Sequence, residues 1–237
     1  MKENKIWNDY LPEDMQEHWT VYECLKESED SSTFLVKETA TGILCVLKWG
    51  RNRQTEFLRN EMEIMEKMAD RKLSGIPKTY RIFEENGEVY LVREYIEGMS
   101  LAQMVLQKGG ISEAEICRIS RKICQTAEQF QNPDEPMIHR DIKPENIVVT
   151  PGGEVVFIDF GTMRSYKKDG SRDTFVVGTR GTAAPEQYGY TQTDQRTDVY
   201  AIGQTMLYMV SESYEMNQLS ECAVSRRMKK IIEKACS

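Results

Sequence analysis

A short run at residues 137–149, MIHRDIKPENIVV, sets several chemically active side chains between apolar ends. A carboxylate such as Asp141 can accept a proton from an attacking hydroxyl, and Lys143 can balance charge on a group in transfer. Asn146 ends the charged part of the run, and Asp159 follows further along the chain. Amide and carboxylate oxygens are hard ligands that suit Mg²⁺, especially where phosphate oxygens complete its shell. These residue types therefore indicate chemistry on a metal-bound phosphate.

The stretch between Asn146 and Asp159 predicts a β-hairpin. Residues 147–150 and 155–158 are β-branched or aromatic, and Pro-Gly-Gly supplies the turn between them. An antiparallel hairpin places its outer ends side by side, so we expect the amide of Asn146 and the carboxylate of Asp159 to face one cation. The alternative, a polar surface loop with a proline turn, does not explain the order of these residues.

A second pair of charges is expected in the first third of the chain, which reads as strands around one helix. Lys48 ends an apolar run, and Glu61 falls on the apolar stripe of the helix at i+4 from Phe57, whereas Glu63 is rotated toward solvent. A buried Lys48–Glu61 ion pair accounts for both charges, and two exposed charges with buried stems are the alternative. The strands are predicted at 21–26, 32–38, 43–49, 76–85 and 88–96, and the helix at 55–69.

The rest of the chain is mostly helical by its apolar spacing, with helices predicted at 111–131, 197–211 and 225–236. The fold class is therefore α+β and bilobal. We expect an N-terminal extension at 1–18, a β-rich lobe at 19–95 and a helical lobe at 96–237, with a hinge near 94–98. A ligand that binds between two such lobes is a reasonable expectation.

Composition narrows the class of protein. The chain has 237 residues, 40% of them hydrophobic, and a net charge of −7, which disfavours nucleic acid as a partner. The most apolar stretch, 200–210, is too short and polar to span a bilayer, and the N-terminus lacks an apolar signal core. The six cysteines form no CxxC pair, so we expect buried, reduced thiols in a cytoplasmic protein.

Three motifs in order resemble the protein kinase family: HRDIKPEN at 139–146, DFG at 159–161 and APE at 184–186. The match runs over about residues 19–235, and Lys143 two residues after Asp141 resembles the serine/threonine type, of a bacterial-like kind. The resemblance implies ATP and Mg²⁺ (or Mn²⁺) as cofactors and a protein with Ser or Thr hydroxyls as substrate.

The resemblance also implies roles for individual residues. The implied catalytic residues are Asp141, Lys143 and Asn146: Asp141 is the base, and Lys143 contacts the phosphoryl group during transfer. Asn146 and Asp159 would bind the metal. Lys48, paired with Glu61, would bind the α- and β-phosphates, and the backbone of Glu94 and Ile96 would bind adenine.

Regulatory roles follow from the same resemblance. Thr179 matches the threonine that contacts the catalytic Asp and Lys, and Arg140 matches an arginine that pairs with a phosphorylated loop residue. Thr174 is the first candidate for that phosphorylated residue and Ser171 the second, and an unmodified loop is the alternative.

The chain departs from the family pattern in two places. Residues 26–31, where a glycine-rich loop is expected, contain no glycine. Carboxylates there would repel the negative charge of a triphosphate, whereas the hydroxyls of Ser28 and Ser31 would donate hydrogen bonds to it. The helical lobe is also short, and no arginine after residue 200 clearly matches the usual partner of Glu186.

We therefore predict a serine/threonine protein kinase that transfers the γ-phosphoryl group of ATP. The glycine-free loop keeps one alternative open, a pseudokinase that binds nucleotide weakly or not at all and acts as an interaction module. A kinase acting on a small molecule is disfavoured by the resemblance of residues 178–186 to the substrate loop of protein kinases.

Overall fold

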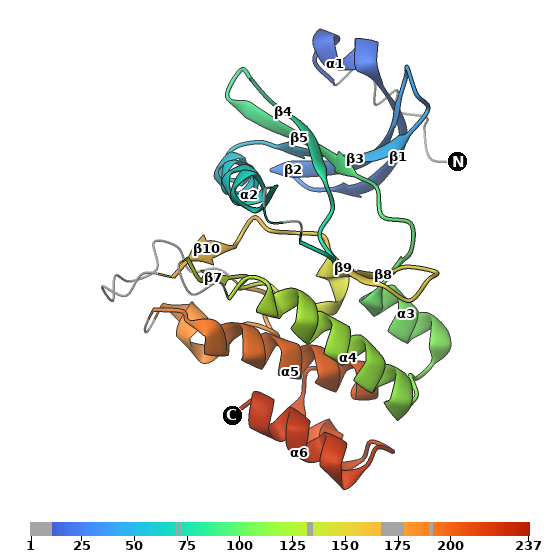
Figure 1. The fold of residues 1–237 in the computed structure, drawn as a ribbon, viewed down its shortest axis with the longest axis vertical. Helices are drawn as coiled ribbons and strands as arrows, with labels where there is room; N and C mark the ends of the chain where they lie inside the picture. Colours follow the sequence, from blue (N-terminus) through green and yellow to red (C-terminus); the bar gives the residue numbers. More distant parts are fainter. Residues whose placement is uncertain (1–10, 70, 72, 132–134, 167–177, 190–191) are drawn as a thin grey trace. The chain divides into compact units, whose positions relative to one another are not determined.

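The computed structural model describes residues 11–69, 71, 73–131, 135–166, 178–189 and 192–237. The chain divides into two compact units, one from residues 1–70 and 77–96 and the other from 71–76 and 97–237. The first unit is built on a β-sheet and the second mainly on helices (Figure 1). The α+β fold class predicted from the sequence is therefore confirmed.

The first unit is a five-stranded antiparallel sheet with the order β1-β2-β3-β5-β4. Its strands are β1 (Trp19–Glu27), β2 (Ser31–Glu38), β3 (Leu44–Gly50), β4 (Thr79–Glu85) and β5 (Glu88–Glu94). Its helices are α1 (Glu13–His18) and α2 (Gln54–Ala69), and α2 lies against the sheet, where it contacts β3 and β5 (Figure 1).

The two faces of this sheet carry different side chains, because residues alternate along each strand. Leu47 lies in register with Phe34 on β2 and Val92 on β5, and all three are buried. Leu11 and Met15 join this cluster, so part of the predicted N-terminal extension belongs to the core. The opposite face, which carries Lys48, is the one that α2 covers.

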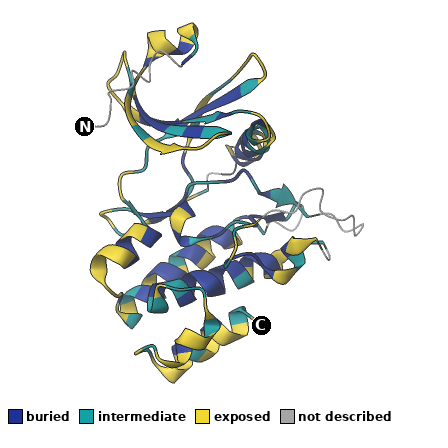
Figure 2. Ribbon diagram, turned by 180° about the vertical axis from the view of Figure 1, so that it is seen from behind, coloured by how far each residue is buried: buried dark blue, intermediate teal, exposed yellow. Residues whose placement is uncertain are grey.

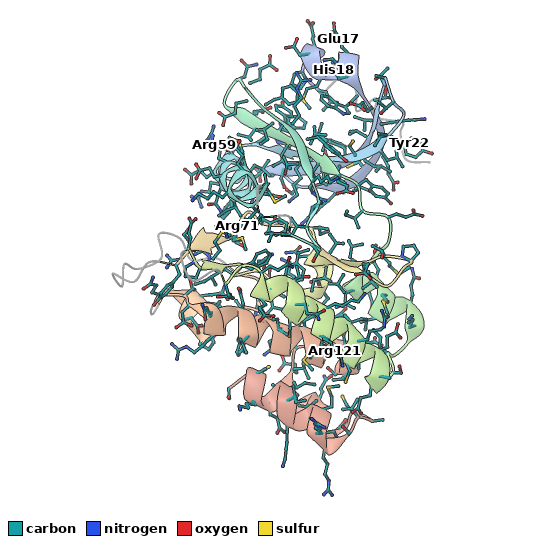
Figure 3. The ribbon with its side chains drawn as sticks, viewed as in Figure 1. Glu17, His18, Tyr22, Arg59, Arg71 and Arg121 are labelled. Carbon is teal, nitrogen blue, oxygen red and sulfur yellow. The ribbon has the colours of Figure 1, made fainter. Side chains whose placement is uncertain are left out.

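The edge strand β1 is interrupted by two irregularities in its pairing, near Tyr22 and Leu25. Tyr22 is 72% exposed and extends from the edge of the sheet (Figure 3). Bulges of this kind bend an edge strand and discourage pairing with another chain.

The second unit contains α3 (Leu101–Lys108), α4 (Glu113–Glu128), α5 (Gln195–Ser211) and α6 (Arg226–Ala235). The side chains of Ser100, Ser112 and Ser225 cap the N-termini of α3, α4 and α6. Most of α5 is buried and contacts α4 and α6, whereas α6 buries only Met228 and Ile232 (Figure 2).

Short strands position the chemically active loops of the second unit. They are β6 (Met99–Ser100), β8 (Ile147–Val149) and β9 (Val155–Phe157) in one sheet, and β7 (Met137–Ile138) with β10 (Arg164–Ser165) in another. Single helical turns at Pro144–Asn146, Pro185–Tyr188 and Met216–Ser220 complete the unit.

Two expectations about the whole chain can be compared with the structure. None of the helices in the described ranges is long and apolar enough to cross a membrane.

All six cysteines are free, but the expectation that they are buried is wrong for most of them. Only Cys45 is buried, and Cys117 and Cys124 are exposed on α4, because they lie off the apolar stripe formed by Ile116, Ile119 and Ile123.

Candidate active site

In the first unit, Lys48 and Glu61 form a buried ion pair. The Nζ atom of Lys48 lies 2.9 Å from Oε1 and 2.8 Å from Oε2 of Glu61. The side chain of Glu61 is 1% exposed and that of Lys48 is 13% exposed, so each charge depends on the other. On the helix, Leu58 rather than Phe57 is buried beside Glu61, because the stripe is turned slightly from the predicted one. Glu63 is exposed.

In the second unit, the carboxylate of Asp141 is held by three side chains. Its Oδ1 accepts a hydrogen bond from the Thr179 hydroxyl at 2.7 Å. Its Oδ2 accepts hydrogen bonds from Lys143 Nζ at 2.7 Å and from Asn146 Nδ2 at 2.8 Å. Lys143 Nζ also donates to the Thr179 hydroxyl at 2.6 Å. The structure thus brings together four residues that the sequence singled out, with Asp141 at their centre.

The predicted hairpin is present as β8 and β9, paired in register from Ile147↔Phe157 to Val149↔Val155. Beyond the pairing, the N–H of Ile158 donates to the carbonyl of Asn146 at 2.9 Å, so the backbone of Asn146 lies beside the residue that precedes Asp159. One carboxylate oxygen of Asp159 accepts the N–H of Gly161 at 3.3 Å. The hairpin therefore carries Asn146 and Asp159 to the same end.

The donor set at this end fits a hard divalent cation. Asn146 Nδ2 donates to the carbonyl and to the carboxylate of Asp141, which leaves the oxygen of the amide as the atom available to a metal. An amide oxygen and a carboxylate are oxygen ligands of the kind that Mg²⁺ prefers. Among the described residues no group of three His, Cys, Asp or Glu side chains forms a metal site by itself. Phosphate oxygens and water would have to supply the rest of the shell.

A buried carboxylate from α5 fixes the loop that carries Asp141. Asp198 accepts the backbone N–H groups of His139 and Arg140, each at 2.9 Å. Arg140 has a φ of +68°, a conformation that is costly for a residue with a side chain. Burial raises the pKa of Asp198 to about 6, and the two amide hydrogen bonds oppose that rise.

His139 is fully buried beneath the same loop. Its ring lies 5.3 Å from Phe157 and 5.4 Å from Phe160 between ring centroids. Burial lowers the pKa of His139 to about 4, so the imidazole is neutral at physiological pH. Its Nδ1 accepts the N–H of Asp141 at 3.4 Å, and the ring supports the loop by packing.

Further contacts to this loop were not predicted. Arg140 Nε donates to the carbonyl of Thr162 at 2.6 Å, and the Thr162 hydroxyl donates to the carbonyl of His139 at 3.0 Å. Gln187 Nε2 donates to the carbonyl of Arg140 at 2.7 Å. Such contacts between side chains and backbone leave no periodic signal in a sequence.

The Arg140 guanidinium predicted to meet a phosphorylated residue is thus engaged with backbone at its Nε atom. The candidate phosphorylation residues, Thr174 and Ser171, lie outside the described residues. Their role stays a prediction.

Glu186 of the APE motif has a partner that sequence reasoning missed. The hydroxyl of Thr197, a residue with no exposed surface, donates to Oε1 of Glu186 at 2.6 Å. A neutral hydroxyl at the start of α5 therefore contacts the carboxylate for which an arginine was expected.

The two residues predicted to bind adenine lie at and just after the end of β5. The N–H of Glu94 donates to the carbonyl of Lys78 at 2.8 Å, and its carboxylate accepts the N–H of Lys78 at 3.0 Å. The carbonyl of Glu94 already accepts a hydrogen bond at 3.2 Å from Nη1 of Arg93, a buried residue. Ile96 follows as the last residue of the first unit.

The loop that replaces the glycine-rich sequence is a tight turn between β1 and β2. The hydroxyl groups of Ser28 and Ser31 lie 2.9 Å apart, and the N–H of Ser28 donates to the carbonyl of Ser31 at 2.8 Å. Both hydroxyls, predicted as phosphate donors, are therefore engaged with each other. The loop is closed on itself rather than open.

Comparison with known proteins gives the same assignment as the motifs. The protein kinase domain family matches residues 20–235. Serine/threonine-protein kinase D of Synechocystis sp. is 32% identical over 199 residues, which are 76% of this chain and 38% of the relative. A probable serine/threonine-protein kinase of Clostridium perfringens is 35% identical over 147 residues, 62% of this chain and 21% of the relative. The 3-phosphoinositide-dependent protein kinase 1 of Arabidopsis thaliana is 26% identical over 215 residues, 84% of this chain and 43% of the relative. The chain spans less than half the length of these relatives.

Proposed function

Because this chain belongs to the protein kinase family, we propose that it transfers the γ-phosphoryl group of ATP to serine or threonine hydroxyls of a protein substrate. The observation that carries the proposal is the arrangement around Asp141, whose carboxylate accepts hydrogen bonds from Thr179, Lys143 and Asn146. The hydrogen bond from Lys143 to the Thr179 hydroxyl supports the serine/threonine type, as does the similarity to serine/threonine-protein kinases.

Each residue has a distinct part in the proposed reaction. Asp141 orients the substrate hydroxyl and accepts its proton as the oxygen attacks the γ-phosphorus. A bond forms between that oxygen and phosphorus, the bond from phosphorus to the β-phosphate oxygen breaks, and ADP leaves. Lys143 stays beside the transferred group and balances its negative charge. The Thr179 hydroxyl keeps Asp141 and Lys143 in position.

Nucleotide and metal are assigned to the remaining residues. Lys48, held by both carboxylate oxygens of Glu61, would bind the α- and β-phosphates. Asn146 and Asp159 would hold Mg²⁺, which neutralises charge on the phosphate oxygens when bound. The free thiols of the chain support a reducing compartment, the cytoplasm.

The test is transfer of radiolabelled phosphoryl from ATP to a generic protein substrate in Mg²⁺. Asp141→Asn keeps the size of the side chain but removes the proton acceptor, so transfer should fall by about 10²- to 10⁴-fold. The matched control is Glu145→Gln, which neutralises an exposed carboxylate of the same loop and should leave transfer unchanged. Equal transfer by wild type and Asp141→Asn would refute the proposal.

A pseudokinase is the second candidate, and two observations favour it. The backbone of Glu94, predicted to bind adenine, already donates its N–H to Lys78 and accepts a hydrogen bond from Arg93 at its carbonyl. The β1–β2 loop contains carboxylates in place of glycines. Thermal stabilisation by ATP without any transfer would support this alternative.

A further inference from the structure

Arg51, just after β3, binds the backbone of the glycine-free loop between β1 and β2. Arg51 Nη2 donates to the carbonyl of Ser28 at 2.9 Å, and its Nε donates to the carbonyl of Glu29 at 3.2 Å. The backbone N–H of Arg51 donates to the carbonyl of Asp30 at 2.8 Å. Three successive carbonyls of the loop therefore point toward one arginine.

Arg51 is itself fixed in place. Its guanidinium carbon lies 4.2 Å from the centre of the Trp49 ring, and Nη2 also donates to the hydroxyl of the buried Ser32 at 3.3 Å. Trp49 in turn donates from Nε1 to the carboxylate of Glu88 at 2.8 Å. A planar guanidinium with several donors can bind two carbonyls and stack on a ring at once, which a lysine cannot.

This attachment determines where the N–H groups of the loop point. Each peptide is planar and trans, so its N–H is directed opposite to its C=O. Carbonyls that converge on Arg51 therefore direct the N–H groups of Glu29, Asp30 and Ser31 away from it. The N–H of Ser31 donates to the Ser28 hydroxyl at 3.1 Å. Those of Glu29 and Asp30 have no partner within the described part of the chain.

The guanidinium of Arg51 and the side chain of Lys48 lie on opposite faces of the sheet, close to the loop, because Arg51 stacks on Trp49 and Lys48 is in register with Thr33, two residues after Ser31. Arg51 contacts Trp49 and Ser32, and Ser32, two residues before Phe34 in β2, lies on the same face as Phe34, the face packed by α1. Lys48, one residue from Trp49, lies on the opposite face with its ammonium group on Glu61. N–H groups directed away from the guanidinium are therefore directed away from the ring of Trp49.

The carboxylate of Asp30 is also held within the unit. Its Oδ1 accepts a hydrogen bond from Asn52 Nδ2 at 2.8 Å, and Asn52 adopts a φ of +49° that its short polar side chain tolerates. Consecutive N–H groups that point the same way form a concavity that binds anions without any need for glycine.

We propose that Arg51 is a positioning residue that converts this loop into a glycine-free phosphate loop. By holding the carbonyls of residues 28–30 on one side, it presents the N–H groups of Glu29 and Asp30 to the phosphates of the nucleotide. This inference rests on the proposed function, because it takes ATP to be the ligand of the Lys48 face.

The test compares a nucleotide with a nucleoside that lacks phosphates. Binding of ATP and of adenosine is measured by calorimetry for wild type, Arg51→Ala and Arg51→Lys. In both variants the Kd for ATP should rise about tenfold, or about 1.4 kcal/mol, while the Kd for adenosine stays within about twofold. Arg51→Lys keeps the cation, so its loss of ATP affinity separates loop geometry from charge, and it carries the prediction if Arg51→Ala does not fold.

The matched control is Arg53→Ala, which removes an exposed arginine two residues away. Its affinities for ATP and adenosine should both equal those of wild type. Unchanged ATP affinity in Arg51→Ala, or full ATP affinity in Arg51→Lys, would overturn the role of Arg51 and leave the proposed function standing. A wild-type chain that binds neither ligand would overturn both.

Discussion

The ion pair between Lys48 and Glu61 gives a prediction about stability that does not depend on enzymatic activity. Glu61→Gln removes one charge and leaves the Lys48 ammonium beside a neutral amide. Lys48→Met leaves the Glu61 carboxylate buried with 1% of its side chain exposed. The double variant removes both charges together, so neither loses the opposite charge that it contacts in the wild type.

The expected magnitudes follow from burial. Removing one partner of a buried ion pair costs about 3–5 kcal/mol, and the 13% exposure of Lys48 places Glu61→Gln near the lower end. Because the double variant removes both partners of one contact, its loss in the free energy of unfolding should be smaller than the sum of the two single losses by about 2 kcal/mol or more.

Urea unfolding followed by tryptophan fluorescence measures this unit selectively, because all three tryptophans of the chain lie at or before residue 49. The control is the same cycle on Arg59, which is labelled in Figure 3, and Glu84. Their charged groups form an exposed pair 2.7 Å apart, and the two substitutions should be additive. Additive losses at Lys48 and Glu61, within about 0.5 kcal/mol, would refute the argument that each charge depends on the other.

Three further outcomes are expected in the second unit. Thr179→Val removes the hydroxyl between Lys143 and Asp141, so kcat should fall about tenfold or more with little change in KM for ATP. Thr179→Ser keeps a hydroxyl and should retain most activity. A change in KM without a change in kcat would contradict this. The pKa of His139 is about 4 in the folded chain and 6.5 in the unfolded chain, so the free energy of unfolding of the wild type should fall as pH falls from about 6.5 to 4. His139→Phe has no such group, so its free energy of unfolding should rise relative to that of wild type by up to about 3 kcal/mol over this range, measured by urea unfolding followed by circular dichroism. A difference between the two proteins that does not change with pH would contradict this. Thr197→Val should cost about 1–2 kcal/mol by leaving Glu186 without its donor, seen as a lower melting temperature, whereas an unchanged melting temperature would show that the contact contributes nothing.

The sequence predicted the parts of the fold that depend on regular alternation. The β-branched arms of the 147–158 hairpin and the apolar stripe of α4 gave both elements nearly in their observed positions. Lys48 and Glu61 could be paired because each interrupts an apolar pattern, and a buried charge requires a partner.

Contacts that a single polar side chain makes with another loop or helix could not be predicted in this way. Arg51 appears in the sequence as one of several surface charges after β3, yet it binds carbonyls more than twenty positions earlier in the chain. Thr197 gives no sign in the sequence that it contacts Glu186, since a threonine at the start of a helix is ordinary. These contacts arise from how loops fold onto neighbouring elements, and single-residue types do not encode that geometry.

The most direct test of the central claim is to identify the amino acids that receive phosphoryl groups. The wild-type chain and Asp141→Asn are incubated with ATP, Mg²⁺ and a protein substrate, and the phosphorylated residues are mapped by mass spectrometry. We expect phosphoserine and phosphothreonine with wild type and neither with Asp141→Asn. Phosphotyrosine alone, no phosphorylation with wild type, or the same phosphorylation with Asp141→Asn would contradict the account.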